Sequence, residues 1–185
     1  SAAEITVPAR KLVDIVRLLP EGASLQAVLE GDKLTISSGR GRYTLATLPA
    51  TEFPATDQVE TLEIIKIQEV KLKNLLDKTA FAMATQDVRY YLNGLLFDFH
   101  DGTRSTVATD GHRLAVCDLD KDLGLAEQRQ LIVPRKGVLE LSRMLSDGDG
   151  MVELALGKNH IRLVKGNSIF TSQLIDGRSP EYKAV

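Results

Sequence analysis

The sequence contains one cysteine, Cys117, no tryptophan and only three histidines among its 185 residues. A single cysteine excludes an intramolecular disulfide and is typical of a reducing compartment, so we expect a cytoplasmic protein. No apolar run is long enough to cross a bilayer and no signal peptide is evident, so we expect no membrane association. Histidine and cysteine also lack metal-ligand spacing, and we predict neither a metal nor a cofactor.

The sequence has no excess of positive charge, with 23 Lys and Arg against 25 Asp and Glu. The net charge of −2 by itself argues against a nucleic-acid-binding protein. Apolar periodicity predicts helices over 8–19, 68–83 and 134–145, and these segments together carry +5, so the remainder carries −7. If the helices share one surface, that surface is a candidate polyanion site. The alternative is that Lys and Arg are good helix formers on solvated faces.

A repeat of long period runs through the chain. Residues 6–54 align with residues 131–180: an offset of 126 pairs Pro8 with Pro134 and Gly31 with Gly157, and one inserted residue then pairs Gly39 with Gly166. Each copy predicts a short strand, a helix begun by proline, and three strands joined by turns rich in Gly, Asp and Asn. The spacing indicates duplicated structural units and not a short-period solenoid.

The segment 61–119 between the two copies has the same organisation, so the chain holds three β-α-β-β-β units. We predict an α+β fold in which helices cover one face of antiparallel sheets. The stretch 49–62, rich in Pro, Thr and Ala, is a plausible linker. We therefore predict that 1–62 is half of one domain and that 63–185 is a nearly whole second domain.

The stretch TVATDGHRLAVC (106–117) has the composition of an active site, because Asp110 lies two positions before His112. In an extended segment both side chains would share a face, but TDG is equally an ordinary turn between strands. Nucleophilic catalysis also needs a nucleophile beside its base, and none is evident. We predict no catalytic residue here.

The stretch QDVRYYLNG (86–94) follows the second predicted helix and places Arg89, Tyr90 and Tyr91 together. Adjacent tyrosines beside a cation could stack on bases and contact phosphates. Alternatively, at the start of a strand, one tyrosine packs inward and the other covers the sheet. The local sequence does not decide between these two interpretations.

Four stretches, MATQDVRYYLNGLLFD, TVATDGHRLAVCDL, LIVPRKGVLELSRML and FTSQLIDGRSPEY, resemble the family of bacterial DNA polymerase III β subunits, the sliding clamps. The resemblance extends to VPARKLVDIVRLLPEG and SGRGRYTLATLP, and so covers essentially the whole chain. It implies a ring of two protomers around duplex DNA, with helices lining the hole and three domains in each protomer. It also implies that this chain is the second half of the first domain plus most of the middle domain, without the third.

The resemblance implies three groups of site residues. The residues expected to contact DNA without reading its sequence are Gln86, Tyr90, Tyr91, Arg135 and Lys136. Those expected to form part of a pocket for short hydrophobic motifs are Leu92, Thr109, Gly111, His112, Arg113, Leu114, Pro180 and Val185. Those expected at the interface between protomers are Lys11, Lys33, Arg40, Arg42, Tyr43 and Leu45.

The function implied by the resemblance is that of a non-catalytic processivity factor of the replicative DNA polymerase. Its partners would be duplex DNA, DNA polymerase subunits, the clamp loader, repair proteins and, at full length, a second copy in a homodimeric ring. Ala184 departs from the family pattern, because relatives can carry a basic residue there. Two alternative functions are a metal-independent hydrolase using Asp110 and His112, and a protein-binding adaptor with no role on DNA.

Overall fold

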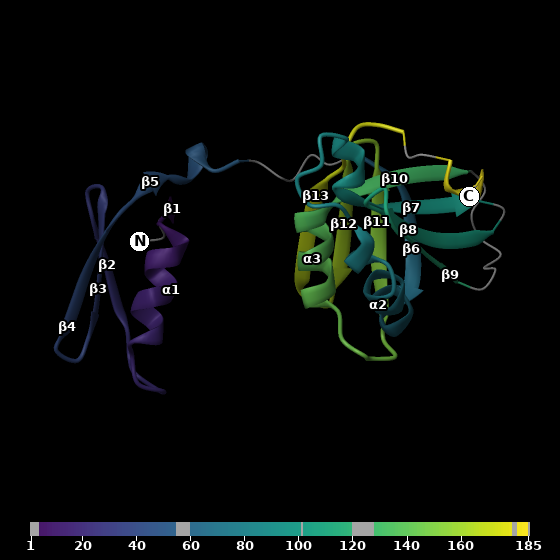
Figure 1. The fold of residues 1–185 in the computed structure, drawn as a ribbon. Helices are drawn as coiled ribbons and strands as arrows, with labels where there is room; N and C mark the ends of the chain where they lie inside the picture. The colour runs from purple at the N-terminus through teal and green to yellow at the C-terminus, as the bar shows by residue number, and fades with distance from the viewer. Residues whose placement is uncertain (1–3, 55–59, 101, 120–127, 179–180, 185) are drawn as a thin grey trace. The chain divides into compact units, whose positions relative to one another are not determined.

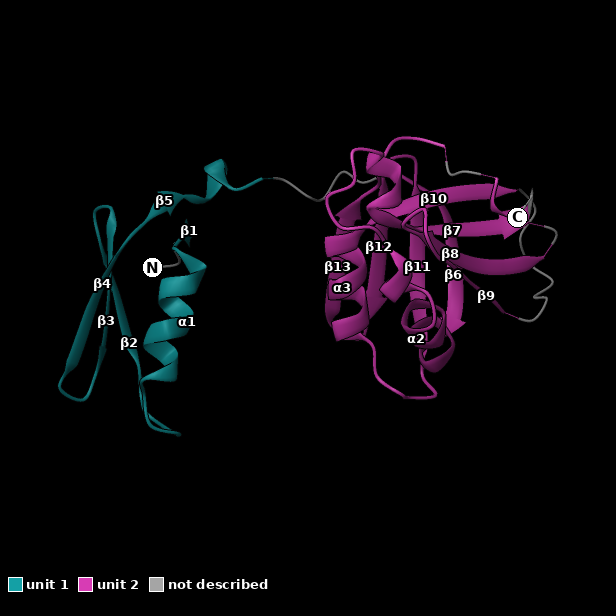
Figure 2. Cartoon of the chain, viewed as in Figure 1, with its two compact units in different colours: residues 1–57 teal, residues 58–185 magenta. Residues whose placement is uncertain are grey.

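The computed structural model describes residues 4–54, 60–100, 102–119, 128–178 and 181–184. The chain divides into two compact units, residues 1–57 and 58–185 (Figure 2). The first strand of the second unit begins at Thr61, two residues before the predicted start of the second domain. No helix in the described ranges is long and apolar enough to cross a membrane.

Unit 1 consists of the predicted strand, helix and three strands. Its first strand β1 (Ile5–Thr6) leads into α1 (Ala9–Arg17), and β2 (Gln26–Glu30), β3 (Lys33–Ser38) and β4 (Gly41–Ala46) form an antiparallel sheet in that order. A short strand β5 (Leu48–Pro49) pairs with β1, and the 3-10 helix η1 (Ala50–Glu52) follows. The helix ends at Arg17, before the predicted limit, because Pro20 disfavours helical backbone at the residue before it.

Unit 2 contains two further copies of the same arrangement. The elements of the first copy are β6 (Thr61–Gln68), α2 (Glu69–Asp77), η2 (Ala80–Ala82), η3 (Tyr90–Leu92), β7 (Gly94–His100), β8 (Thr103–Thr109) and β9 (Leu114–Leu119). The elements of the second copy are β10 (Arg129–Pro134), α3 (Arg135–Met144), β11 (Met151–Gly157), β12 (His160–Lys165) and β13 (Ser168–Gln173), followed by η4 (Tyr182–Ala184). The repeated α+β organisation predicted from the sequence is confirmed.

The predicted helix over 68–83 is too long, because α2 ends at Asp77. The hydroxyl of Thr79 donates a hydrogen bond to the carbonyl oxygen of Leu75 at 2.6 Å, and the backbone of Thr79 is no longer helical. The chain then makes the separate 3-10 helix η2. Because Ala82 and Met83 still face the core, the apolar period continues past the point where the helix stops.

The two copies in unit 2 exchange their first strands. In the described part of this unit the sheets run in the order β10-β7-β8-β9 and β13-β12-β11-β6. Strand β6 of the first copy thus pairs with β11 of the second, and β10 of the second pairs with β7 of the first. Each four-stranded sheet therefore combines three strands of one copy with the first strand of the other.

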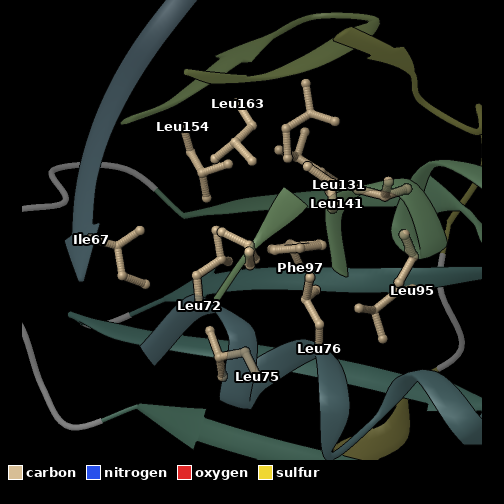
Figure 3. Close-up of a cluster of buried hydrophobic side chains, with 14 of the residues drawn as sticks. Ile67, Leu72, Leu75, Leu76, Leu95, Phe97, Leu131, Leu141, Leu154 and Leu163 are labelled. Carbon is tan, nitrogen blue, oxygen red and sulfur yellow. The ribbon is translucent and has the colours of Figure 1, made fainter. Parts of the chain in front are cut away.

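The main core lies between these sheets and the two helices, which pack against each other (Figure 1). Figure 3 shows Phe97 of β7 among Leu72 and Leu76 of α2 and Leu141 of α3. Strand β7 is buried along nearly its whole length because both of its faces are covered. Leu95, Phe97 and Phe99 face the main core, while Leu96 faces a second, smaller cluster on the other side.

A buried carboxylate joins three elements of unit 2. Glu69, the first residue of α2, is 5% exposed and accepts hydrogen bonds from the backbone N–H and hydroxyl of Ser146. It also forms an ion pair with Lys165 of β12, whose ammonium group donates to the carbonyl oxygen of Met144. The hydrogen bond from Lys165 and those from Ser146 lower the pKa of Glu69 to about 2.

Glu69→Gln is expected to make unit 2 less stable at neutral pH and less sensitive to acid. A carboxyl whose pKa is depressed on folding stabilises the folded state above its unfolded pKa, and that contribution is lost as the pH falls towards 2. The midpoint of urea unfolding, measured between pH 7 and pH 2, should fall less steeply for the variant. Glu153→Gln, at a half-exposed pair with Lys66, is the control. Parallel pH profiles for wild type and Glu69→Gln would contradict the assignment.

Candidate functional site

The turn between β8 and β9 is built by its own side chains. Asp110 Oδ1 accepts hydrogen bonds from the backbone N–H groups of His112 and Arg113 at 2.9 and 3.0 Å. The Thr109 hydroxyl donates to the carbonyl oxygen of Arg113 at 2.7 Å and accepts from the N–H of Gly111, which has a φ of 86°. Those backbone hydrogen bonds, from His112 first, lower the pKa of Asp110. The carboxylate therefore shapes a turn and does not orient the imidazole for catalysis.

This turn forms one side of a cleft of about 430 Å³ in unit 2. All the predicted pocket residues that the structure describes line the cleft, namely Leu92, Thr109, Gly111, His112, Arg113 and Leu114. Pro180 and Val185 lie outside the described residues. An apolar concavity with polar groups at its rim suits the anchoring of a hydrophobic side chain from a ligand.

Four further residues line the cleft that the sequence did not predict for it, namely Arg89, Tyr91, Glu181 and Tyr182. The sequence indicates Arg89 and Tyr91 only as candidates for contacts with nucleic acid. Glu181 and Tyr182 directly follow Pro180, and that adjacency is the one signal that could have indicated them. Local periodicity contains no information on which distant segments meet at a cleft.

The cations at the rim of the cleft are held by fixed partners. Arg89 donates from Nε and Nη2 to the two oxygens of Asp87 at 3.0 and 2.8 Å, and this contact is the largest cause that lowers the Asp87 pKa to about 2. Arg113 donates to the carbonyl oxygen of Phe81 at 2.7 Å, and its guanidinium lies 5.6 Å from the centre of the Phe81 ring. Both guanidinium groups are thereby oriented before any ligand arrives.

The two tyrosines of the QDVRYYLNG stretch lie in a 3-10 helix, η3, and not at the start of a strand. Tyr90 is 58% exposed, whereas Tyr91 packs against the small cluster on the outer face of β7. Their rings meet edge to face, with centroids 5.9 Å apart. One tyrosine thus packs inward, as the second interpretation expected, but the other faces solvent and neither lies at the start of a strand. Contact of Tyr90 with nucleic acid stays a prediction.

The loop before η3 is held in an unusual conformation. Gln86 is exposed and has a φ of 58°, a region that residues other than glycine rarely adopt. The side-chain amide of Asn93 fixes the loop, because its oxygen accepts from the N–H of Asp87 at 2.9 Å and its nitrogen donates to the carbonyl oxygen of Asp87 at 2.8 Å. Such a fixed, uncommon geometry occurs frequently at functional positions.

This loop adjoins the start of α3. The backbone N–H of Arg135 donates to the carbonyl oxygen of Asn93 at 2.9 Å, and the Arg135 guanidinium donates to the carbonyl oxygen of Met83 at 3.4 Å. Lys136, next along the helix, is exposed. The structure therefore brings the segment that carries Gln86 and Tyr90 next to the basic start of α3, although about 50 residues separate them in the sequence.

The residues predicted at the protomer interface lie in unit 1. Lys11 on α1, Lys33 at the start of β3, Arg40 in the β3–β4 turn and Arg42 on β4 are exposed. Tyr43 is half-buried, and Leu45 is only 4% exposed because it packs with Ile15 and Ile36 in the core of the unit. Within unit 1, β4 is an edge strand, since the sheet order is β2-β3-β4. The interface itself stays a prediction.

The described ranges contain no group of three or more His, Cys, Asp and Glu side chains arranged to hold a metal ion. Cys117 is half-buried on β9. The features that the structure brings together are a hydrophobic cleft with preoriented cations, and a basic helix start next to the segment that carries an exposed tyrosine. Both arrangements suit binding.

The family comparisons cover both units. Residues 66–181 match the family model for the central domain of the DNA polymerase III beta subunit, and residues 1–57 match the model for its N-terminal domain. The chain is 50% identical over 182 residues to the Beta sliding clamp of Pseudomonas aeruginosa, covering 98% of this chain and 50% of that protein. It is 49% identical over 180 residues to the Beta sliding clamp of Escherichia coli K12, covering 97% and 49% respectively.

Solved structures give the same result. The crystal structure of the DNA polymerase III subunit beta from Pseudomonas aeruginosa matches with a TM-score of 0.90 at 49% identity, over 100% of this chain and 51% of that one. A structure of the same organism's sliding clamp bound to griselimycin matches with a TM-score of 0.89 at 49% identity, with the same coverage of both chains. The chain spans about half the length of the curated relatives it matches. It belongs to the DNA polymerase III beta subunit family.

Proposed function

We propose that this chain is part of a ring-shaped sliding clamp that keeps the replicative DNA polymerase on duplex DNA. The observation that carries the proposal is similarity of about 50% identity to Beta sliding clamps along nearly the whole chain. In this proposal, unit 1 is the second half of the first domain and unit 2 is the middle domain. The complete protein is a cytoplasmic, non-catalytic subunit of the polymerase assembly and closes as a homodimer.

The segment around Gln86 and Tyr90, together with Arg135 and Lys136, is proposed to face the DNA. The supporting observation is that the segment with the exposed Tyr90 and the uncommon backbone of Gln86 is hydrogen-bonded, through Asn93, to the basic start of α3. Contacts of this kind neutralise phosphates and do not read base sequence, so binding is independent of sequence and sensitive to salt.

The cleft beside the β8–β9 turn is proposed to take short hydrophobic motifs from polymerases, the clamp loader and repair proteins. Its lining combines the apolar Leu92 and Leu114 with the oriented cations of Arg89 and Arg113, which supports a peptide ligand. Griselimycin, which is bound in one Pseudomonas aeruginosa clamp structure, is proposed to occupy the same cleft here.

The clamp proposal is tested by the topology of DNA binding. The complete gene product is loaded onto nicked circular DNA, washed with high salt, and followed after the circle is cut. Retention on the circle and loss from the linear form is expected, because a closed ring can leave only over an end. Equal loss from both forms, or retention on both, would contradict encirclement.

Charge reversal tests the proposed DNA face. Lys136→Glu, alone and with Arg135→Glu, should weaken DNA binding and reduce the slope of log K against log salt concentration by about 1 for each phosphate that the protein no longer neutralises. Lys158→Glu, at another exposed lysine of unit 2, is the matched control and should have little effect. Unchanged salt dependence in the double variant would favour the adaptor function, in which the basic helix start is only solvated.

A further inference from the structure

A carboxylate is buried in the sheet that carries the β8–β9 turn of the cleft. Asp98 lies on β7 and is 0% exposed, on the face of the strand opposite Phe97 and Phe99. On this face Asp98 lies opposite Ser105 of β8 and Gln130 of β10, next to the cluster that contains Leu96 and Val107. Burying a carboxylate is unfavourable unless it is hydrogen-bonded, so an aspartate here requires a compensating partner.

That partner comes from the end of the chain. The hydroxyl of Tyr182, in η4, donates to Asp98 Oδ2 at 2.6 Å across a separation of 84 residues. The ammonium group of Lys183 lies 4.0 Å and His100 Nδ1 3.4 Å from the same oxygen. Asp98 Oδ1 has no hydrogen-bond partner among the described residues. The docking of η4 therefore supplies the short hydrogen bond that stabilises this buried charge.

Tyr182 is also a wall of the cleft. Its ring packs on the small cluster with Tyr91 and Ile175, and the residue lines the cleft together with Glu181. Burial and the Asp98 contact raise the pKa of Tyr182 above its ordinary value, so the hydroxyl stays a donor at physiological pH. The same side chain thus contacts the carboxylate through its hydroxyl and bounds the cleft.

We propose that Asp98 is a positioning residue. It holds the side chain of Tyr182 in place, and Tyr182 in turn forms a preformed wall of the cleft for the bound peptide. The inference rests on the proposed function of the cleft. If the wall is already ordered before binding, the binding free energy does not have to offset the entropy lost on ordering it. If the wall is docked in only a fraction of the molecules, the apparent dissociation constant equals the intrinsic constant divided by that fraction.

The test is the dissociation constant of griselimycin on the complete gene product, measured by calorimetry. Tyr182→Phe keeps the ring and removes the hydroxyl, and Asp98→Ala removes the acceptor. A hydrogen bond to a charged group is strong enough that each change should weaken binding about tenfold. Because both substitutions remove the same hydrogen bond, the double variant should bind griselimycin no more weakly than the weaker-binding single variant does.

Asp118→Asn is the matched control, because Asp118 is exposed on β9 and affects Tyr182 only through its charge. Its affinity should stay within about twofold of wild type, since exposed charges contribute little. Unchanged binding by Tyr182→Phe, or effects that multiply in the double variant, would overturn the positioning role. Tyr182→Phe alone decides the matter if Asp98→Ala fails to fold. Failure of the wild type to bind would instead overturn the cleft assignment, and the positioning role with it.

Discussion

Replacing Leu114 by aspartate is expected to weaken binding of griselimycin, or of a hydrophobic polymerase peptide, by about 30-fold or more. Leu114 is 39% exposed at the start of β9 and lines the cleft. Truncating a central apolar contact commonly costs about 2 kcal/mol of binding free energy, and a carboxylate adds the cost of desolvating its charge. A change of about 1.4 kcal/mol corresponds to a factor of ten in affinity.

The matched control is Val116→Asp. Val116 lies two residues further along β9, on the same face and with similar exposure of 45%, but it does not line the cleft. Both variants add one negative charge to the same strand, so a general effect of charge or folding would appear in both. Calorimetric titration of the complete gene product distinguishes them. Equal losses in the two variants would mean that the cleft is not the binding site.

Phe97→Ala is expected to lower the free energy of unfolding of unit 2 by about 3–5 kcal/mol. Phe97 is 1% exposed at the centre of β7 and contacts leucines of both helices (Figure 3). Its ring also lies 6.3 Å from that of Phe99. Removing it leaves a cavity at the point where β7 meets both helices. The loss is a large part of the roughly 5–15 kcal/mol typical of a folded domain.

Urea unfolding followed by amide hydrogen exchange in β7 and β8 measures this loss in unit 2 itself. Phe53→Ala is the control, because Phe53 is 67% exposed in unit 1 and undergoes the same chemical change. It should alter stability by no more than about 0.5 kcal/mol. A cost below about 1.5 kcal/mol for Phe97→Ala would show that the core repacks around the gap.

The structure agrees best with the sequence-based predictions for elements that depend on neighbouring residues. The three helices follow from the spacing of leucine and valine, and the β-α-β-β-β repeat follows from matched prolines and glycines in the two copies. For the TDGHR stretch, an ordinary turn was one of two interpretations, and the structure shows a turn in which Asp110 accepts the backbone hydrogen bonds. The helix over 68–83 was wrong at its end, because the hydroxyl of Thr79 competes for a backbone carbonyl while the apolar period continues.

The candidate site was only partly predictable. The residues of the turn are contiguous in sequence, and those expected in the pocket, Thr109 and Gly111 to Leu114, line one cleft. Arg89 and Tyr182 were not assigned to it, because the family resemblance implied only other residues of the same two segments, namely Leu92, Pro180 and Val185. The aromatic pair at Tyr90 and Tyr91 needed the structure as well, since two adjacent tyrosines do not reveal which of them faces the core.

The sequence by itself determined the amphipathic helices and the turn, because each depends on residues within a few positions of one another. It also determined the repeat, because the two copies share matched prolines and glycines. The tertiary structure decided the exchange of β6 and β10 between the two copies, the closing of the cleft by Tyr182 and the burial of Asp98. Strands of similar apolar pattern can pair with several partners, and a buried charge is tolerated only where a distant donor meets it. Those choices depend on the free energy of the whole packed unit, which no local pattern contains.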